Sequence, residues 1–285
     1  MLLLGTFLIS GWAWATDTPT KTIHIKGSDT LFKALKEWTK VYQEREPGVR
    51  IEVTGGGSGN GIAALLNGHI EIASSSRPLR KREMQIFAKK HGGNELVTHV
   101  VARDAVSVVV HPSNPIHGLS LQQLTEIYSK QNHAPTWEEL GVTVPGCPDQ
   151  KILPISRKNN SGTYLFFRQA ILDQNEHFDA NTISMDASDA IVTMVAQMPC
   201  AIGYSGMAFV TNAVKTLCIS KIHQSNAPCV PPTTASTVDQ AYPLARSLYL
   251  YTLGEPGGEI KKFLDWILSP EGREILTRTG YIPPP

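Results

Sequence analysis

The chain has 285 residues, of which 41% are hydrophobic and 18% are charged, and a chain of this length can bury the cores of two packed lobes. This composition excludes a disordered or fibrous protein. The formal net charge of +1 provides no large positive field to attract nucleic acid or an acidic membrane. Any recognition of an anion must therefore be local, and the expected ligand is small.

Residues 1–15 are predominantly apolar and end in Ala13, Trp14 and Ala15, the small-x-small pattern that signal peptidase recognises. We therefore expect a cleaved signal peptide, a mature chain that starts at Thr16, and a periplasmic protein. The alternative is a short buried segment. No cysteine lies near the cleavage site, so no lipid anchor is indicated, and no later apolar run approaches the ~20 residues that a membrane-spanning helix needs.

From Thr22 onward, short β-rich runs alternate with amphipathic helical runs, a pattern typical of an α/β protein. In the first part of the chain, strands are predicted at 22–26, 50–54 and 70–74, and helices at 30–44 and 62–68. The first helix has the clearest pattern, because Leu31, Leu35 and Trp38 recur on one helical face. Pro47 and Gly48 end this helix.

The Val-rich segment 96–110 is interrupted by Arg103 and Asp104, a pair too polar for the middle of a buried strand, so this strand is predicted to cross between two lobes. The crossing divides the chain into a first lobe, 16–104, a second lobe, 105–204, and a return to the first lobe, 205–285. Further elements are predicted as a strand at 201–204, a surface loop at 228–234, a strand at 247–252, and helices at 257–268 and 270–279. The core is expected to contain Trp38, Trp137 and Trp266.

The four cysteines, an even number in an oxidising compartment, make disulfides plausible. We favour a bond between Cys218 and Cys229, because the segment between them contains Pro228 and is typical of a loop. Cys147 and Cys200 either pair or stay free. No C-x-x-C motif occurs and the nine histidines show no ligand spacing, so no metal site is predicted.

Three junctions between a strand and a helix are rich in Gly, Ser and Thr, at 27–30, 55–61 and 159–164. The start of a helix exposes unpaired N–H groups and a partial positive charge, so each junction can hold an oxyanion. Singly, each is more often a simple helix cap. The three together favour an oxyanion site with Arg157 and Arg77, because a guanidinium matches a tetrahedral oxyanion. The alternative for each arginine is an ion pair.

The remaining motifs of known chemistry are incomplete in this chain. Residues 59–64 fit the dinucleotide fingerprint G-x-G-x-x-A, but the next strand ends in serines instead of the acidic residue that holds a ribose. No G-x-S-x-G motif surrounds Ser58, Ser161 or Ser205, and no P-loop motif occurs. The sequence therefore predicts neither catalytic residues nor a bound cofactor.

Several longer motifs lie in order along the chain: GSDTL at 27–31, GGGSGNGI at 55–62, SSSRPL at 74–79, ISRKNNSGTYLFF at 155–167, AIGYSG at 201–206, YPLARSLYLYT at 242–252 and LSPEGREIL at 268–276. Together they resemble the phosphate-binding proteins of bacterial high-affinity phosphate ABC transporters. The S-G-T triplet preceded by an arginine is the most specific, since that arrangement contacts the anion in the family.

The resemblance implies a type II periplasmic-binding-protein fold, an α/β protein of two lobes joined by two crossing strands with the ligand in the cleft. It also implies that the partners are inorganic phosphate or a similar oxyanion and the permease subunits of an ABC transporter. We expect a monomer that does not bind nucleic acid. By motif, the ligand residues of the first lobe are Thr30, Leu31 and Ser58. Those of the second lobe are Arg157, Ser161, Gly162 and Thr163.

One departure from the family concerns the acceptor for the ligand's proton. Family members with an aspartate at the end of the third strand use it for this purpose, and here that place is Ser76, followed by Arg77 as an additional positive contact. Asp29 is the candidate substitute, with a helix cap as its alternative role. The other functions to test are binding of a sulfate-like oxyanion, a phosphoester hydrolase, and an extracellular or signalling module that keeps the fold without transport.

Overall fold

The computed structural model describes residues 21–91, 96–131, 135–173, 176–222 and 228–284. The predicted signal peptide, 1–15, lies outside these residues. Across the described ranges, no helix has both the length and the apolar character needed to cross a membrane.

Strands and helices alternate along the chain, as the sequence predicts. The first lobe begins with β1 (Lys21–Gly27), α1 (Asp29–Arg45), β2 (Val49–Thr54), α2 (Ser58–Leu66), β3 (Ile72–Ser75) and α3 (Lys81–His91). The chain then forms β4 (Leu96–Val110), β5 (Gly118–Ser120), α4 (Leu121–Tyr128), β6 (Leu153–Arg157), α5 (Gly162–Ile171), β7 (Ile183–Met185), α6 (Ser188–Gln197) and β8 (Ala201–Gly206). The last elements are the 3-10 turn η1 (Met207–Phe209), β9 (Lys215–Thr216), β10 (Cys218–Ser220), α7 (Thr234–Val238), β11 (Ala245–Leu253), α8 (Gly258–Leu268) and α9 (Pro270–Arg278).

The bounds of β4 are those predicted, whereas α2 begins at Ser58 instead of Ile62. Residues 58–61 of the glycine-rich segment are therefore helical, and α2 packs directly on the backbone of β1. A Cβ added to Gly61 would overlap the carbonyl oxygen of Lys26, so only glycine permits this approach.

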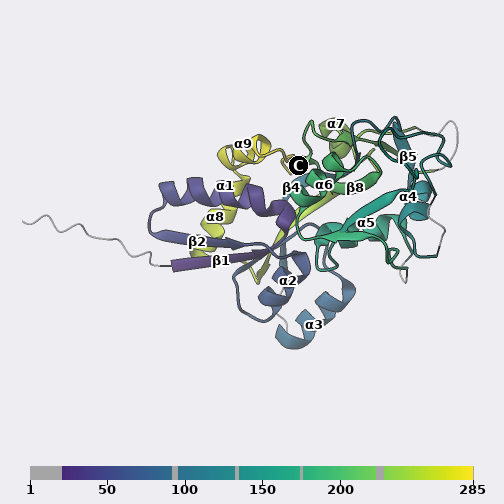
Figure 1. Ribbon diagram of the computed structural model, residues 1–285. Helices are drawn as coiled ribbons and strands as arrows, with labels where there is room; N and C mark the ends of the chain where they lie inside the picture. The colour runs from purple at the N-terminus through teal and green to yellow at the C-terminus, as the bar shows by residue number, and fades with distance from the viewer. Residues whose placement is uncertain (1–20, 92–95, 132–134, 174–175, 223–227, 285) are drawn as a thin grey trace, which may run out of the picture.

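β4 carries the chain from one lobe to the other. The strand order is β2-β1-β3-β11-β4-β8-β6-β7, with β9 beside β4. β4 pairs with β11 through residues 96–105 and with β8 through residues 106–110, so the crossing lies between these two stretches (Figure 1). The predicted two-lobed α/β fold, with a strand that crosses between the lobes, is confirmed.

Each lobe has its own hydrophobic core. In the first lobe, α1, α8 and α9 pack on the sheet around the fully buried Trp38, and Trp266 joins them. In the second lobe, Trp137 is fully buried among α4, α5 and β8. All three tryptophans therefore lie in the core, as predicted.

The return to the first lobe comes later than the sequence division at 205. Leu217, Ile219, Tyr242 and Leu244 are buried in the core of the second lobe. The physical reason is strand pairing, since β9 pairs with the second-lobe end of β4 and β10 pairs with β5. Ala208 of η1 packs against the first-lobe core, but the next strand that joins the first-lobe sheet is β11.

Two disulfides join the four cysteines, and both lie in the second lobe. The structure pairs Cys218 with Cys229, the bond that the sequence favours, and also pairs Cys147 with Cys200. The bond between Cys218 and Cys229 packs against β5, because a Cβ added to Gly118 would overlap both of its sulfur atoms.

Candidate functional site

The starts of α1, α2 and α5 meet between the lobes. β1 and β2 are parallel neighbours, so α1 and α2, which follow them, begin at the same edge of the sheet. From the other lobe, Thr163 Oγ1 lies 2.8 Å from Thr30 Oγ1. A Cβ added to Gly162 would overlap Ser58 Oγ and lie 2.5 Å from Ser76 Oγ. The three helix starts that the sequence predicts as oxyanion junctions therefore lie against one another between the lobes.

Serine residues cap two of these helices. The hydroxyl of Ser28 accepts a hydrogen bond from Leu31 N at 3.3 Å, and that of Ser161 accepts one from Tyr164 N at 3.3 Å. Because Ser28 caps α1, Asp29 is the first residue of the helix and its carboxylate is not the cap. Asp29 therefore has another role.

The start of α2 differs, because Gly57 precedes it with a φ of 91° and no side chain caps it. The hydroxyl of Ser58 instead accepts a hydrogen bond from Ser76 N at 3.1 Å and lies 3.3 Å from Ser76 Oγ. Both serines are buried. A hydroxyl can donate and accept hydrogen bonds, so this pair can donate to an anion and can also accept a hydrogen bond from an anion that carries a proton.

Arg157, the last residue of β6, is 2% exposed and is held by three groups. Its Nη1 donates to Ser188 Oγ at 2.8 Å, and its Nη2 donates at 2.7 Å to both the carbonyl oxygen of Asp186 and Oδ2 of Asp29. Its buried Nε has no hydrogen-bond partner among the described residues. A buried charged donor without a partner is costly, so this Nε is a candidate donor to a ligand.

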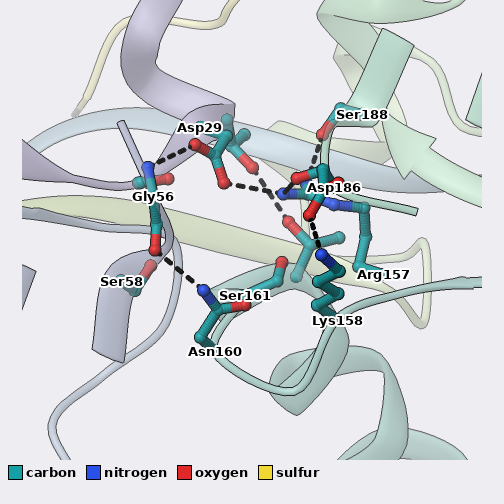
Figure 2. A network of polar contacts seen from close by, with 12 residues as sticks. Asp29, Gly56, Ser58, Arg157, Lys158, Asn160, Ser161, Asp186 and Ser188 are labelled. Atoms are coloured by element: carbon teal, nitrogen blue, oxygen red, sulfur yellow. Dashed lines mark hydrogen bonds and ion pairs between the residues drawn. The ribbon is translucent and has the colours of Figure 1, made fainter. Parts of the chain in front are cut away.

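Direct contacts between the lobes surround the site (Figure 2). The Asp29 carboxylate accepts from Gly56 N at 2.8 Å and from Arg157 of the opposite lobe. Asn160 Nδ2 donates to the carbonyl oxygen of Gly56 at 3.0 Å, and Gly59 N donates to the carbonyl oxygen of Asn160 at 3.2 Å. Sequence patterns place Asp29 near the site but do not predict its ion pair with Arg157.

Comparison with known proteins places this geometry in a family. A family model described as a PBP superfamily domain matches residues 13–271. The phosphate-binding protein PstS of Pseudomonas aeruginosa is 32% identical over 270 residues, which cover 91% of this chain and 82% of that protein. The chain belongs to the PBP superfamily, in the family of PstS phosphate-binding proteins. The resemblance seen in the sequence motifs is confirmed.

Three further proteins are also similar to this chain along most of their length. The PstS protein of Bacillus subtilis is 29% identical, with coverage of 92% of this chain and 80% of that protein. A candidate phosphate ABC transporter substrate-binding protein from Clostridium perfringens, solved with bound phosphate, has a TM-score of 0.80 at 26% identity and covers 93% of this chain and 100% of its own. An ABC-type phosphate transport receptor from Vibrio cholerae has a TM-score of 0.73 at 26% identity, with 92% and 100% coverage.

The side chain of Arg77 is not brought into the site. Its Nη1 and Nη2 donate to the two carboxylate oxygens of Glu83 at 2.8 and 2.7 Å, and both residues are buried. The alternative of an ion pair therefore describes Arg77. Burial raises the pKa of the Glu83 carboxyl, but hydrogen bonds and charge from Arg77 and Arg80 outweigh it and leave the pKa below its usual value.

We expect Arg77→Gln to destabilise the protein by about 2 kcal/mol at pH 7, less than the loss of an isolated buried pair because Arg80 still contacts Glu83. The folded-state pKa of Glu83 is lowered, so its contribution is present at neutral pH and is lost as the pH falls through that pKa. The difference in the free energy of unfolding between wild type and Arg77→Gln should therefore be smaller at about pH 3 than at pH 7. Urea unfolding at both pH values measures this difference in the free energy of unfolding. An equal difference at both pH values would contradict the ion pair between Arg77 and Glu83 as its cause.

Two charged residues beneath the site, Asp104 and Arg246, are not among the predicted ligand residues. They face each other across β4 and β11, where Arg246 Nε and Nη2 donate to Asp104 Oδ2 at 2.9 and 2.6 Å. Burial raises the pKa of the Asp104 carboxyl, and Arg246 opposes part of that rise. The sequence shows Asp104 only as a polar interruption of a strand, because nothing local identifies a partner 142 residues away.

Proposed function

We propose that this protein binds inorganic phosphate in the periplasm and delivers it to the permease of an ABC transporter. The observation that carries the proposal is the convergence of three helix starts on the buried Arg157, because this set gives a small tetrahedral anion many donors and a compensating charge. The names of the PstS relatives and the phosphate bound to the Clostridium perfringens protein support phosphate as the ligand.

We propose ligand contacts from both lobes. In the first lobe, the backbone N–H group of Thr30 and the hydroxyls of Thr30, Ser58 and Ser76 would donate. The N–H group of Leu31 would exchange its 3.3 Å hydrogen bond to Ser28 Oγ for one to the ligand. In the second lobe, Arg157 Nε and the Ser161, Gly162 and Thr163 group at the start of α5 would donate. The Arg77 side chain is left out of the proposed set because both of its Nη atoms contact Glu83.

Phosphate differs from sulfate at neutral pH because it still carries a proton, and a site that recognises this proton must contain an acceptor. We propose that the Ser58 and Ser76 hydroxyl pair provides it, since both oxygens lie at the site and neither is ionised. Titration calorimetry with phosphate and with sulfate at neutral pH tests the ligand. Tighter binding of sulfate would overturn phosphate as the ligand, and turnover in a phosphatase assay would favour the hydrolase.

The division of the contacts between two lobes predicts a closing motion. Phosphate should favour the closed form, because only there do both sets of donors reach the anion. X-ray scattering should show a smaller radius of gyration with phosphate, and the double variant Arg157→Ala, Thr163→Val should abolish the change. Tight binding with unchanged scattering and hydrogen exchange would place the site within one lobe.

For Asp29 we propose a role in closure, because both carboxylate oxygens already accept hydrogen bonds from protein donors. Asp29→Asn should weaken binding of phosphate and sulfate alike by about 1.5 kcal/mol, since the ion pair to Arg157 is lost. Asp189→Asn is the matched control, because Asp189 lies in the first turn of α6 and is exposed. Calorimetry with both anions decides: a changed phosphate-to-sulfate ratio would instead make Asp29 the acceptor for the ligand's proton.

The periplasmic location and a monomeric state are part of this proposal. Export would follow from cleavage of residues 1–15, which leaves a mature chain that starts at Thr16. Intact-mass measurement on protein from a periplasmic extract tests the cleavage, and a mass that includes residues 1–15 would contradict it. A chain that fails to restore uptake in a transporter lacking its binding protein would favour the non-transport signalling module.

A further inference from the structure

The buried ion pair between Asp104 and Arg246 is asymmetric with respect to the site. Asp104 is fully buried, and besides Arg246 it accepts a hydrogen bond from Met207 N at 3.1 Å. The guanidinium lies on the site side of the pair, where Nη1 donates to the carbonyl oxygen of Ser76 at 3.1 Å and Nη2 approaches Thr30 Oγ1 at 3.4 Å. The positive member of the pair therefore contacts two proposed ligand residues, Thr30 and Ser76.

Arg246 also reaches the opposite lobe. Its guanidinium carbon lies 5.4 Å from the centre of the Phe166 ring, which belongs to α5. α5 is the helix whose start supplies the second-lobe contacts. The same guanidinium thus touches the end of β3, the start of α1 and the body of α5, the elements that must come together around an anion.

We infer that Arg246 is a second positive charge for the bound anion, held beneath the site by Asp104, and that it orients the Thr30 hydroxyl as a donor. Because Thr30 Oγ1 accepts from Arg246, its own proton is directed away from that arginine, toward Thr163 or the ligand. An anion bonded to Thr30 would lie within about 6 Å of the guanidinium. The inference rests on the proposed function and adds a positioning residue to it.

The test uses two substitutions that break the same ion pair but leave opposite members of it. Arg246→Gln removes the positive charge, whereas Asp104→Asn keeps it without its counterion. Both should lower the melting temperature, because each leaves a buried group without its partner. Phosphate affinity should fall about tenfold or more in Arg246→Gln and stay equal or rise in Asp104→Asn, because a unit charge at this distance is weakly screened inside a protein.

A purely structural role for the pair predicts a different result, since affinity would then follow the melting temperature and fall in both variants. That result, or an affinity of Arg246→Gln within about threefold of wild type, would overturn the inference. Arg246→Lys is the conservative control and should retain more affinity than Arg246→Gln. If Arg246→Gln does not fold, Asp104→Asn decides alone: unchanged or tighter binding supports the inference and weaker binding overturns it.

The wild-type arm separates this inference from the proposed function. If wild type binds sulfate and not phosphate, phosphate as the ligand is wrong, and the two variants are compared with sulfate instead. If wild type binds neither anion by calorimetry, both the proposed function and the inference are overturned. If wild type binds phosphate and the two variants respond alike, only the inference fails.

Discussion

Arg157→Ala is expected to weaken phosphate binding by about 2–5 kcal/mol, because the buried ligand charge loses its charge-assisted partner. The loss corresponds to roughly 30-fold to several thousand-fold in the dissociation constant. The substitution also removes the interlobe contact to Asp29. Titration calorimetry measures the affinity, and circular dichroism should remain that of wild type.

Arg77→Ala is the matched control for this experiment. Arg77 is an arginine of similar burial, 3% exposed against 2% for Arg157, and it also pairs with a carboxylate. It lies at the end of β3, close to the site in sequence, but its guanidinium contacts Glu83. Its phosphate affinity should stay within about threefold of wild type. An Arg157→Ala protein with the same affinity as this control would remove Arg157 from the ligand set.

Gly162→Ala should weaken phosphate binding by about 3 kcal/mol or more, although it keeps the backbone N–H that the ligand would use. The added methyl group would overlap Ser58 Oγ and crowd Ser76 Oγ, and both of these atoms belong to the opposite lobe. Each lobe can fold normally with this methyl group, so the cost falls on the closed form. The melting temperature without phosphate should therefore be close to that of wild type.

Calorimetry and X-ray scattering on the same samples test this expectation. Gly162→Ala should show both a weaker affinity and a smaller compaction on addition of phosphate. Gly257→Ala serves as the control, because no heavy atom outside its neighbours lies within 4 Å of an added Cβ at Gly257. Wild-type affinity together with full compaction in Gly162→Ala would mean that α5 does not approach Ser58 in the liganded protein.

The elements that depend on local patterning were predictable from the sequence. The apolar spacing that includes Leu31, Leu35 and Trp38 predicts α1 to within one residue at each end, because a helix buries residues by their 3.6-residue period. The bounds of β4 were also predicted from local sequence, because a Val-rich run has a strong preference for strand structure. The three junctions before α1, α2 and α5 were likewise recognisable, because Gly, Ser and Thr before a helix are a local chemical signal, although α2 begins four residues earlier than predicted.

The partners of the charged residues were not predictable, because no local rule gives them. Arg77 lies just after β3, Arg157 is the last residue of β6, and each precedes a helix, so the sequence gives no reason to distinguish them. The fold separates them: Glu83 of α3 takes both Nη atoms of Arg77, while Arg157 keeps a buried Nε without a partner. The residues next to each arginine in the sequence therefore do not reveal which group its guanidinium contacts in the folded protein.

By itself, the sequence determined the order of strands and helices, the crossing strand, the disulfide between Cys218 and Cys229 as the favoured bond, and three junctions between a strand and a helix as candidates for anion binding. Only the tertiary structure decided that these starts meet and that Asp29 joins Arg157 across the lobes. It also placed Arg246 against Asp104, across a register set by the pairing of β11 with β4. The physical reason is that helix capping and periodicity act between residues a few positions apart, whereas an ion pair forms between whatever charges the packed sheets bring within 3–4 Å.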